Sequence, residues 1–90
     1  MHIKTFSSET LWVEATTTLI TSCLNTSTNT HIALSGGSTP LPIYTSLRKG
    51  TYPFDNLHLY LVDERYTSLE STDSNYRSIF DIFVSRVKGL

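Results

Sequence analysis

The sequence predicts a mixed α/β fold built on a parallel sheet. Two short, mostly apolar runs, residues 31–35 and 57–62, are typical of strands buried in such a sheet. A helical pattern precedes the first run and another follows each run, so helix and strand alternate along the chain. This alternation favours parallel strands joined by helical crossovers, with helices covering both faces of the sheet.

The first helix is predicted to begin near Ser7-Ser8-Glu9, which can cap a helix and places an acid in its first turn. One helical face is then marked by apolar spacings of three and four, at Trp12, Ala15, Leu19 and Cys23, with Leu11, Ile20 and Leu24 beside it. We expect Trp12 in the core and Cys23 as a packed, inert thiol. Three consecutive threonines, residues 16–18, lower the helix propensity, so this helix must depend on packing.

The second helix is predicted directly after the first strand and the segment Gly36-Gly37-Ser38-Thr39-Pro40. Pro40 suits the first helical position, and Thr39 or Ser38 can cap the helix. The inward side is expected at Ile43, Tyr44 and Leu47, and Gly50 is a plausible end.

The second strand, residues 57–62, leads into Asp63-Glu64-Arg65 and a polar loop. Asp73 or Ser74 can cap a third helix, whose apolar side is predicted at Tyr76, Phe80, Phe83, Val84 and Val87, with Phe80 and Phe83 in the core. His58, inside the second strand, is expected to be a hydrogen-bonded core histidine rather than a general base.

Size and composition limit the class of protein. Ninety residues allow one small domain, and a net charge of −1 provides no basic field for nucleic acid or an anionic membrane. A single cysteine excludes an intrachain disulfide framework, and the first residues lack a long apolar segment, so we expect a soluble cytoplasmic protein.

Two strands cannot complete a parallel sheet. Residues 1–90 are therefore predicted to be a single partial domain: a fragment, a truncated gene product or half of an assembly. A missing C-terminal half or a second chain would complete the sheet.

The first candidate site is the glycine-rich turn after the first strand, because ligands of open parallel sheets bind beyond the carboxyl ends of the strands. Gly36 and Gly37 allow backbone amides to approach an anion, Ser38 and Thr39 add hydroxyl donors, and the following helix presents its positive end. This combination favours phosphate binding. A tight turn with an ordinary cap is the alternative.

The second candidate site is the end of the second strand, where the side chains of Asp63 and Arg65 are expected to share one direction. The carboxylate could fix a sugar hydroxyl or a cation, and the guanidinium could bind phosphate or stabilise an oxyanion. A surface ion pair is the alternative. Ser74-Asn75-Tyr76 could add ligand contacts, or could be a helix cap with one buried tyrosine. No histidine has a partner at the helical spacing of a metal site, so no metal is predicted.

Three segments together resemble, in order and spacing, the motifs of the 6-phosphogluconolactonases: residues 34–40 (Leu-Ser-Gly-Gly-Ser-Thr-Pro), 62–65 (Val-Asp-Glu-Arg) and 73–76 (Asp-Ser-Asn-Tyr). Glucosamine-6-phosphate deaminases share the sheet and a glycine-threonine-proline turn, but usually carry Asp-Glu-Tyr where this chain has Arg65. The arginine and the Ser-Asn-Tyr segment favour the lactonase. The resemblance covers essentially the whole chain, but only the N-terminal part of the longer family domain.

The resemblance implies hydrolysis of 6-phosphoglucono-1,5-lactone to 6-phosphogluconate in the oxidative pentose phosphate pathway, without a metal or organic cofactor. By position it implies catalytic roles for Asp63 and Arg65. Contacts with the substrate and its phosphate are implied for Gly36, Gly37, Ser38, Thr39, Ser74 and Asn75.

The chain departs from the family pattern in two ways. The family's general base is a histidine in a later Gly-Asp-Gly-His-type motif that is absent here, so the isolated 90 residues are expected to be inactive. Tyr66-Thr67 stands where many relatives have Val-Pro, which affects the shape of the loop. Two other functions stay open: a non-catalytic sugar-phosphate-binding or assembly module, and an isomerase-deaminase acting on an amino sugar phosphate, against which Arg65 argues.

Overall fold

The computed structural model describes residues 3–26, 28–50, 52 and 54–87. Its helices are α1 (Glu9–Thr26), α2 (Leu41–Arg48) and α3 (Asn75–Ile82), and its strands are β1 (Thr30–Leu34) and β2 (Leu57–Leu61). Short 3₁₀ helices cover Phe54–Asn56 and Val84–Arg86. The predicted order of helix, strand, helix, strand, helix is confirmed, and none of the described helices is long and apolar enough to cross a membrane.

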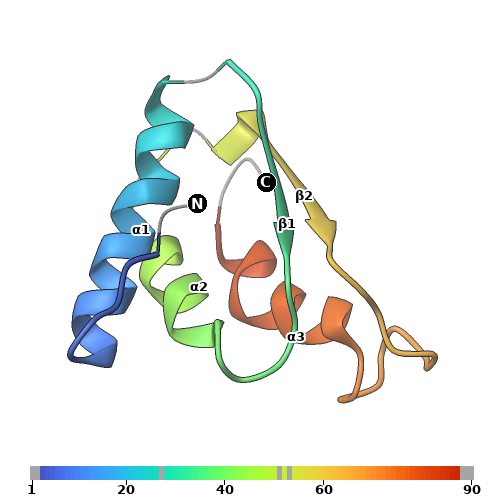
Figure 1. Ribbon diagram of the computed structural model, residues 1–90. Helices are drawn as coiled ribbons and strands as arrows, with labels where there is room; N and C mark the ends of the chain where they lie inside the picture. Colours follow the sequence, from blue (N-terminus) through green and yellow to red (C-terminus); the bar gives the residue numbers. More distant parts are fainter. Residues whose placement is uncertain (1–2, 27, 51, 53, 88–90) are drawn as a thin grey trace.

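The two strands are parallel, as predicted, and pair in register from Thr30 opposite Leu57 to Leu34 opposite Leu61. The amide of Val62 extends the ladder by donating to the carbonyl oxygen of Leu34 at 2.9 Å. Helix α2 forms the crossover between the strands, so both strands end at the same edge of the sheet (Figure 1). The fold class predicted from the sequence, a mixed α/β fold built on a parallel sheet flanked by helices, is confirmed, and the arrangement is Rossmann-like.

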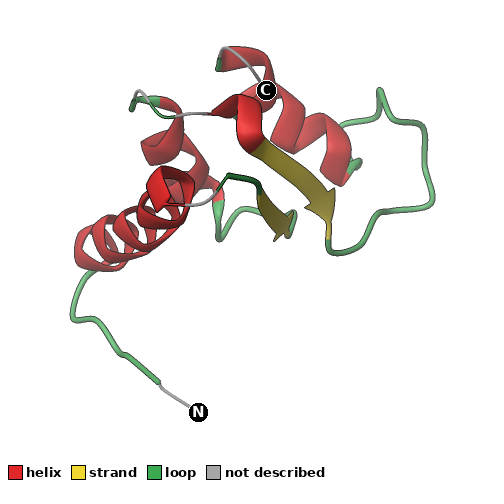
Figure 2. Ribbon diagram, turned by 90° about the horizontal axis from the view of Figure 1, so that it is seen from above, coloured by secondary structure: helices red, strands yellow, loops and turns green. Residues whose placement is uncertain are grey.

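In the described part of the chain, helices cover one face of the sheet rather than both. Figure 2 shows α2 and α3 on the same side of the strands, with α1 beside α2. On the covered face Leu34 and Leu57 are buried, whereas the other face exposes His31, Ala33, His58 and Tyr60. The prediction of a core position for His58 is therefore wrong, because its side chain belongs to the uncovered face.

The core lies between the covered face of the sheet and the helices. Its buried apolar residues are Leu24, Leu34, Ile43, Tyr44, Leu47, Phe54, Leu57, Ile79 and Phe83. The inward side predicted for the second helix is thereby confirmed. At the centre, the ring of Phe83 packs between Tyr44 and Phe54, with centroids 6.5 and 5.7 Å away. Aromatic pairs at these separations contribute beyond the area that they bury.

Helix α1 begins as predicted, because the amide of Leu11 donates to Oγ of Ser8 at 3.2 Å, but it buries a different face. Leu24 and Thr21 are buried, whereas Leu19 is 66% exposed and Cys23 is also exposed. A threonine contributes to the contact with α2, where Oγ1 of Thr17 donates to Oγ of Ser46 at 3.1 Å. The prediction of a packed thiol at Cys23 is therefore wrong, because the buried face of the helix includes a threonine as well as apolar residues.

Helix α3 is capped as predicted, since Oγ of Ser74 accepts from the amide of Arg77 at 3.1 Å. It ends at Ile82, earlier than the sequence pattern suggested, and Phe83 leaves the helical conformation with φ −127°. Phe83 is buried, but Phe80 is 39% exposed and so does not belong to the core. Trp12 of α1 is half-buried against the core cluster rather than fully inside it.

Candidate functional site

The glycine-rich segment forms the predicted turn between β1 and α2. Gly37 has φ +86°, a left-handed conformation that a residue with a Cβ adopts only with strain. The start of the turn is tied to α2 by Tyr44, whose buried hydroxyl donates to the carbonyl oxygen of Ser35 at 2.7 Å. Burial raises the pKa of this tyrosine, so the hydroxyl stays a donor.

The helix after the turn starts one residue later than expected. Pro40 is the N-cap residue, and no side chain caps α2, so the proposed capping by Ser38 or Thr39 hydroxyls is wrong. The backbone of Ser38 closes the turn instead: the amide of Leu41 donates to its carbonyl oxygen at 3.3 Å. The side chains of Ser38 and Thr39 are exposed at the surface of the turn.

Asn75 brings the two candidate sites together. Its amide nitrogen Nδ2 donates to Oδ1 of Asp63 at 3.0 Å and to the carbonyl oxygen of Asp63 at 3.1 Å. The same side chain lies on Gly36, where a Cβ would overlap the Asn75 amide and come within 2.9 Å of its Cβ. The glycine turn and the end of β2 are therefore held at one edge of the sheet through a single buried side chain.

Glu64 caps helix α3 and also bonds to the backbone of Arg65. Its Oε1 accepts from the amides of Arg65 at 2.8 Å and Asn75 at 2.6 Å. Its Oε2 accepts from the amide of Tyr76 and from Oγ of Ser74, both at 2.9 Å. These bonds, led by the one from Tyr76, lower the pKa of Glu64 to about 2, so it is ionised at neutral pH.

The candidate site residues thus divide into two groups. Gly36, Asp63, Ser74 and Asn75 are engaged in contacts within the chain, and Ser74 and Asn75 are 1% and 7% exposed. Gly37, Ser38, Thr39 and Arg65 lie exposed at the same edge, where a ligand can reach them. Among the described residues Arg65 forms no ion pair with either neighbouring acid, so the alternative of a surface ion pair is not what the structure shows.

Two contributors to this arrangement are absent from the sequence-based predictions. Glu64 stands ten residues before Ser74, and no local pattern indicates that its carboxylate reaches the start of α3. The sequence predicts that Tyr44 faces inward, but the hydrogen bond from its hydroxyl to the carbonyl oxygen of Ser35 depends on how α2 crosses the sheet.

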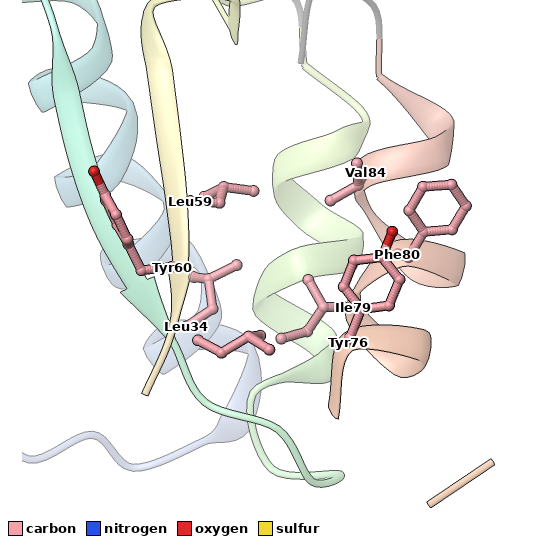
Figure 3. Close-up of a pocket in the computed structure, with 8 residues that line it drawn as sticks. Leu34, Leu59, Tyr60, Tyr76, Ile79, Phe80 and Val84 are labelled. Atoms are coloured by element: carbon pink, nitrogen blue, oxygen red, sulfur yellow. The ribbon is translucent and has the colours of Figure 1, made fainter. Parts of the chain in front are cut away.

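An apolar groove of about 170 Å³ lies beside β2, between that strand and α3 (Figure 3). Leu34, Leu59, Tyr60, Leu61, Tyr76, Ile79, Phe80 and Val84 line it. Of the candidate residues named from the sequence, Tyr76 alone belongs to this lining, and the groove offers no cationic group to a phosphate. We therefore place the candidate ligand site at the glycine turn and Arg65, not in the groove.

The histidines of the strands lie away from this edge. His31 and His58 are opposite each other in the register, their rings stack at 4.5 Å, and Nδ1 of His31 is 2.9 Å from the hydroxyl of Tyr60. His58 is also 3.4 Å from Oδ1 of Asn29, before the start of β1. Within the described ranges no three or more histidine, cysteine or acidic side chains gather as a metal site.

A family model described as glucosamine-6-phosphate isomerases/6-phosphogluconolactonase matches residues 8–90. The chain belongs to this family. The match begins just before helix α1, so it includes the glycine turn, the end of β2 and the start of α3. The resemblance drawn from the sequence is confirmed.

Individual relatives carry the lactonase name. A 6-phosphogluconolactonase of Thermotoga maritima is 44% identical over 57 residues, which cover 63% of this chain and 26% of that protein. A 6-phosphogluconolactonase of Synechocystis is 43% identical over 61 residues, covering 68% and 25%. The crystal structure of the Thermotoga maritima enzyme matches with a TM-score of 0.79 and 37% identity, over 88% of this chain and 36% of that one. The chain thus spans about a quarter of the length of these curated relatives.

Proposed function

We propose that the protein to which this chain belongs is a 6-phosphogluconolactonase, which hydrolyses 6-phosphoglucono-1,5-lactone to 6-phosphogluconate in the oxidative pentose phosphate pathway. The observation that carries the proposal is the contact of Asn75 with both Gly36 and Asp63, which holds the two motifs of the resemblance at one sheet edge. The lactonase names of the relatives support the same activity. In this proposal residues 1–90 form one partial domain, completed by further polypeptide.

The proposed roles follow from exposure and chemistry at that edge. The exposed turn, Gly37, Ser38 and Thr39, supplies backbone amides and hydroxyl groups to the phosphate. Arg65 supplies a planar, permanently charged guanidinium that can bind a phosphate oxygen or the oxyanion that forms when water attacks the lactone carbonyl. Asp63, fixed by Asn75, lies beside it and can hold a sugar hydroxyl.

Ser74 and Asn75 have a supporting role in this proposal. The sequence resemblance predicts that both contact the substrate, but their side chains are buried and hydrogen-bonded within the chain. We propose that they act by fixing the loop between β2 and α3. Ser74 caps the helix, and Asn75 sets the separation between the two halves of the site.

Hydrolysis of the lactone needs a base to take a proton from water, and we propose that this base lies outside the 90 residues. His31 and His58 stack on the uncovered sheet face, and His58 is near Asn29 at the amino end of β1. A general base contributes about 10²- to 10⁴-fold, so a chain without one is expected to be inactive. The proposed compartment is the cytoplasm, which the single cysteine of this chain supports.

The test is a hydrolysis assay on the purified full-length protein, with the rate of spontaneous lactone opening in buffer subtracted. We expect turnover of 6-phosphoglucono-1,5-lactone and no release of ammonia from glucosamine 6-phosphate. Residues 1–90 alone should give the buffer rate. Ammonia release without lactone hydrolysis would instead assign the isomerase-deaminase activity, and binding of a sugar phosphate without either reaction would assign a non-catalytic module.

A further inference from the structure

Glu64 stands between two candidate site residues, yet its carboxylate faces helix α3. Hydrogen bonds from Arg65, Ser74, Asn75 and Tyr76 converge on its two oxygens. Three of these four donors belong to the cap and first turn of α3, and the fourth is the amide of Arg65. One side chain therefore ties the backbone of Arg65 to the start of the helix.

This tie matters because packing does not define the loop that holds Arg65. Residues 62–70 are all exposed, so the loop buries none of its own side chains. The buried side chain of Asn75 holds the loop at Asp63, where its Nδ2 donates to the backbone carbonyl oxygen at 3.1 Å, but it makes no bond to Arg65. Other bonds act further along the loop: the amide of Thr67 donates to the carbonyl oxygen of Arg65 at 2.8 Å, and Nη1 of Arg77 donates to that of Glu70 at 2.9 Å. The bonds from Asn75 to Asp63 connect the beginning of the loop with its end, and Glu64 extends this connection to the backbone of Arg65.

We propose that Glu64 is a positioning residue for lactone hydrolysis, which holds the backbone of Arg65 so that the guanidinium projects toward the substrate. The inference rests on the proposed function. In this role Glu64 does not touch the substrate, because both of its oxygens are bonded to the chain. Without the hydrogen bonds of Glu64, Arg65 keeps its charge, but the orientation of its guanidinium is no longer fixed. A misplacement of about 1 Å can cost about 10²-fold in rate.

The experiment compares three variants of the full-length enzyme. Glu64→Gln replaces one acceptor oxygen with an amide that cannot accept, so two of the four donors lose their partner. Ser78→Gly weakens the interior of α3. It also removes the hydrogen bond from Oγ of Ser78 to the carbonyl oxygen of Ser74, but it leaves all four donors to Glu64 in place. Glu70→Gln removes another exposed carboxylate from the same loop. We expect Glu64→Gln to lower kcat by about 10- to 100-fold, and the other two variants to keep the wild-type kcat.

A second measurement reports on Arg65 without activity. We expect the NMR order parameter of the Arg65 amide to fall from a rigid value near 0.85 to below about 0.6 in Glu64→Gln, but not in Ser78→Gly. The proposal is overturned if the Arg65 amide stays ordered in Glu64→Gln. It is also overturned if Glu64→Gln and Ser78→Gly lose equal activity at an equal loss of Tm. A wild-type protein without lactonase activity would overturn the proposed function, and the order parameter would still decide whether Glu64 holds Arg65.

Discussion

Asn75 lies directly on Gly36, so closely that a Cβ on the glycine would come within 2.9 Å of the Cβ of the asparagine. The contact joins the turn after β1 to the first residue of α3. The asparagine cannot easily give way, because its backbone amide bonds to Glu64 and its side chain bonds to Asp63. The absence of a side chain at position 36 is therefore a condition for assembling the site.

Gly36→Ala should destabilise the protein by about 1–3 kcal/mol, the usual cost of forcing extra atoms into a packed region. Urea denaturation of the full-length protein would measure the loss. The double variant Gly36→Ala/Asn75→Gly, which removes the opposing side chain, should be more stable than the sum of its single changes predicts. Additive losses would show that the two residues do not oppose each other.

Position 37 tests backbone conformation rather than space, because nothing lies within 4 Å of a Cβ built there. With φ at +86°, Gly37→Ala should cost about 1 kcal/mol through strain alone. Gly37→Asn should cost less, since asparagine adopts left-handed conformations more readily. Thermal unfolding of both variants checks the order, and equal stabilities of the alanine and asparagine variants would contradict it.

The cap formed by Glu64 predicts a pH dependence of stability. Its pKa is about 2 in the folded chain, against an ordinary value of 4.5, because the amide of Tyr76 and three further donors favour the carboxylate. A lowered pKa means that the cap stabilises the fold fully above about pH 4.5, and that this contribution disappears as pH falls from 4.5 toward 2.

The difference in unfolding free energy between wild type and Glu64→Gln should therefore shrink as pH falls through that range. Urea denaturation at several pH values measures it. Glu14→Gln, on the exposed side of α1, controls for the loss of one negative charge. A difference between wild type and Glu64→Gln that stays constant from pH 6 to pH 3 would contradict the cap.

The sequence was sufficient to predict the strands, their parallel direction and the turn between β1 and α2, because these features depend on local apolar runs and on glycine. It was not sufficient for the buried face of α1. Thr17 and Thr21 lie on the packed face together with apolar residues, and a pattern based on hydrophobicity alone does not include threonines. His58 reads as buried because its neighbours are apolar, but the exposure of alternate residues in β2 follows from helices covering one face.

The location of the candidate site was predictable from the sequence, but the separate roles of its residues were not. The carboxyl ends of parallel strands meet at one edge, so the order of helices and strands is enough to place the two motifs together. Which members bind a ligand and which support the others depends on long-range contacts. Asn75 reaches Asp63 and Glu64 reaches Ser74 across a loop, and no spacing rule indicates either bond.

The most direct test of the account is kcat/KM for lactone hydrolysis by Arg65→Lys in the full-length protein, with Arg86→Lys as a matched control at another exposed arginine. Lysine keeps the charge but loses the planar fork of donors. We predict a loss of about 10- to 150-fold, equivalent to about 1.5–3 kcal/mol for hydrogen bonds to a charged group, with Tm unchanged and Arg86→Lys unaffected. A folded Arg65→Lys variant with wild-type kcat/KM would contradict the account and remove Arg65 from the site.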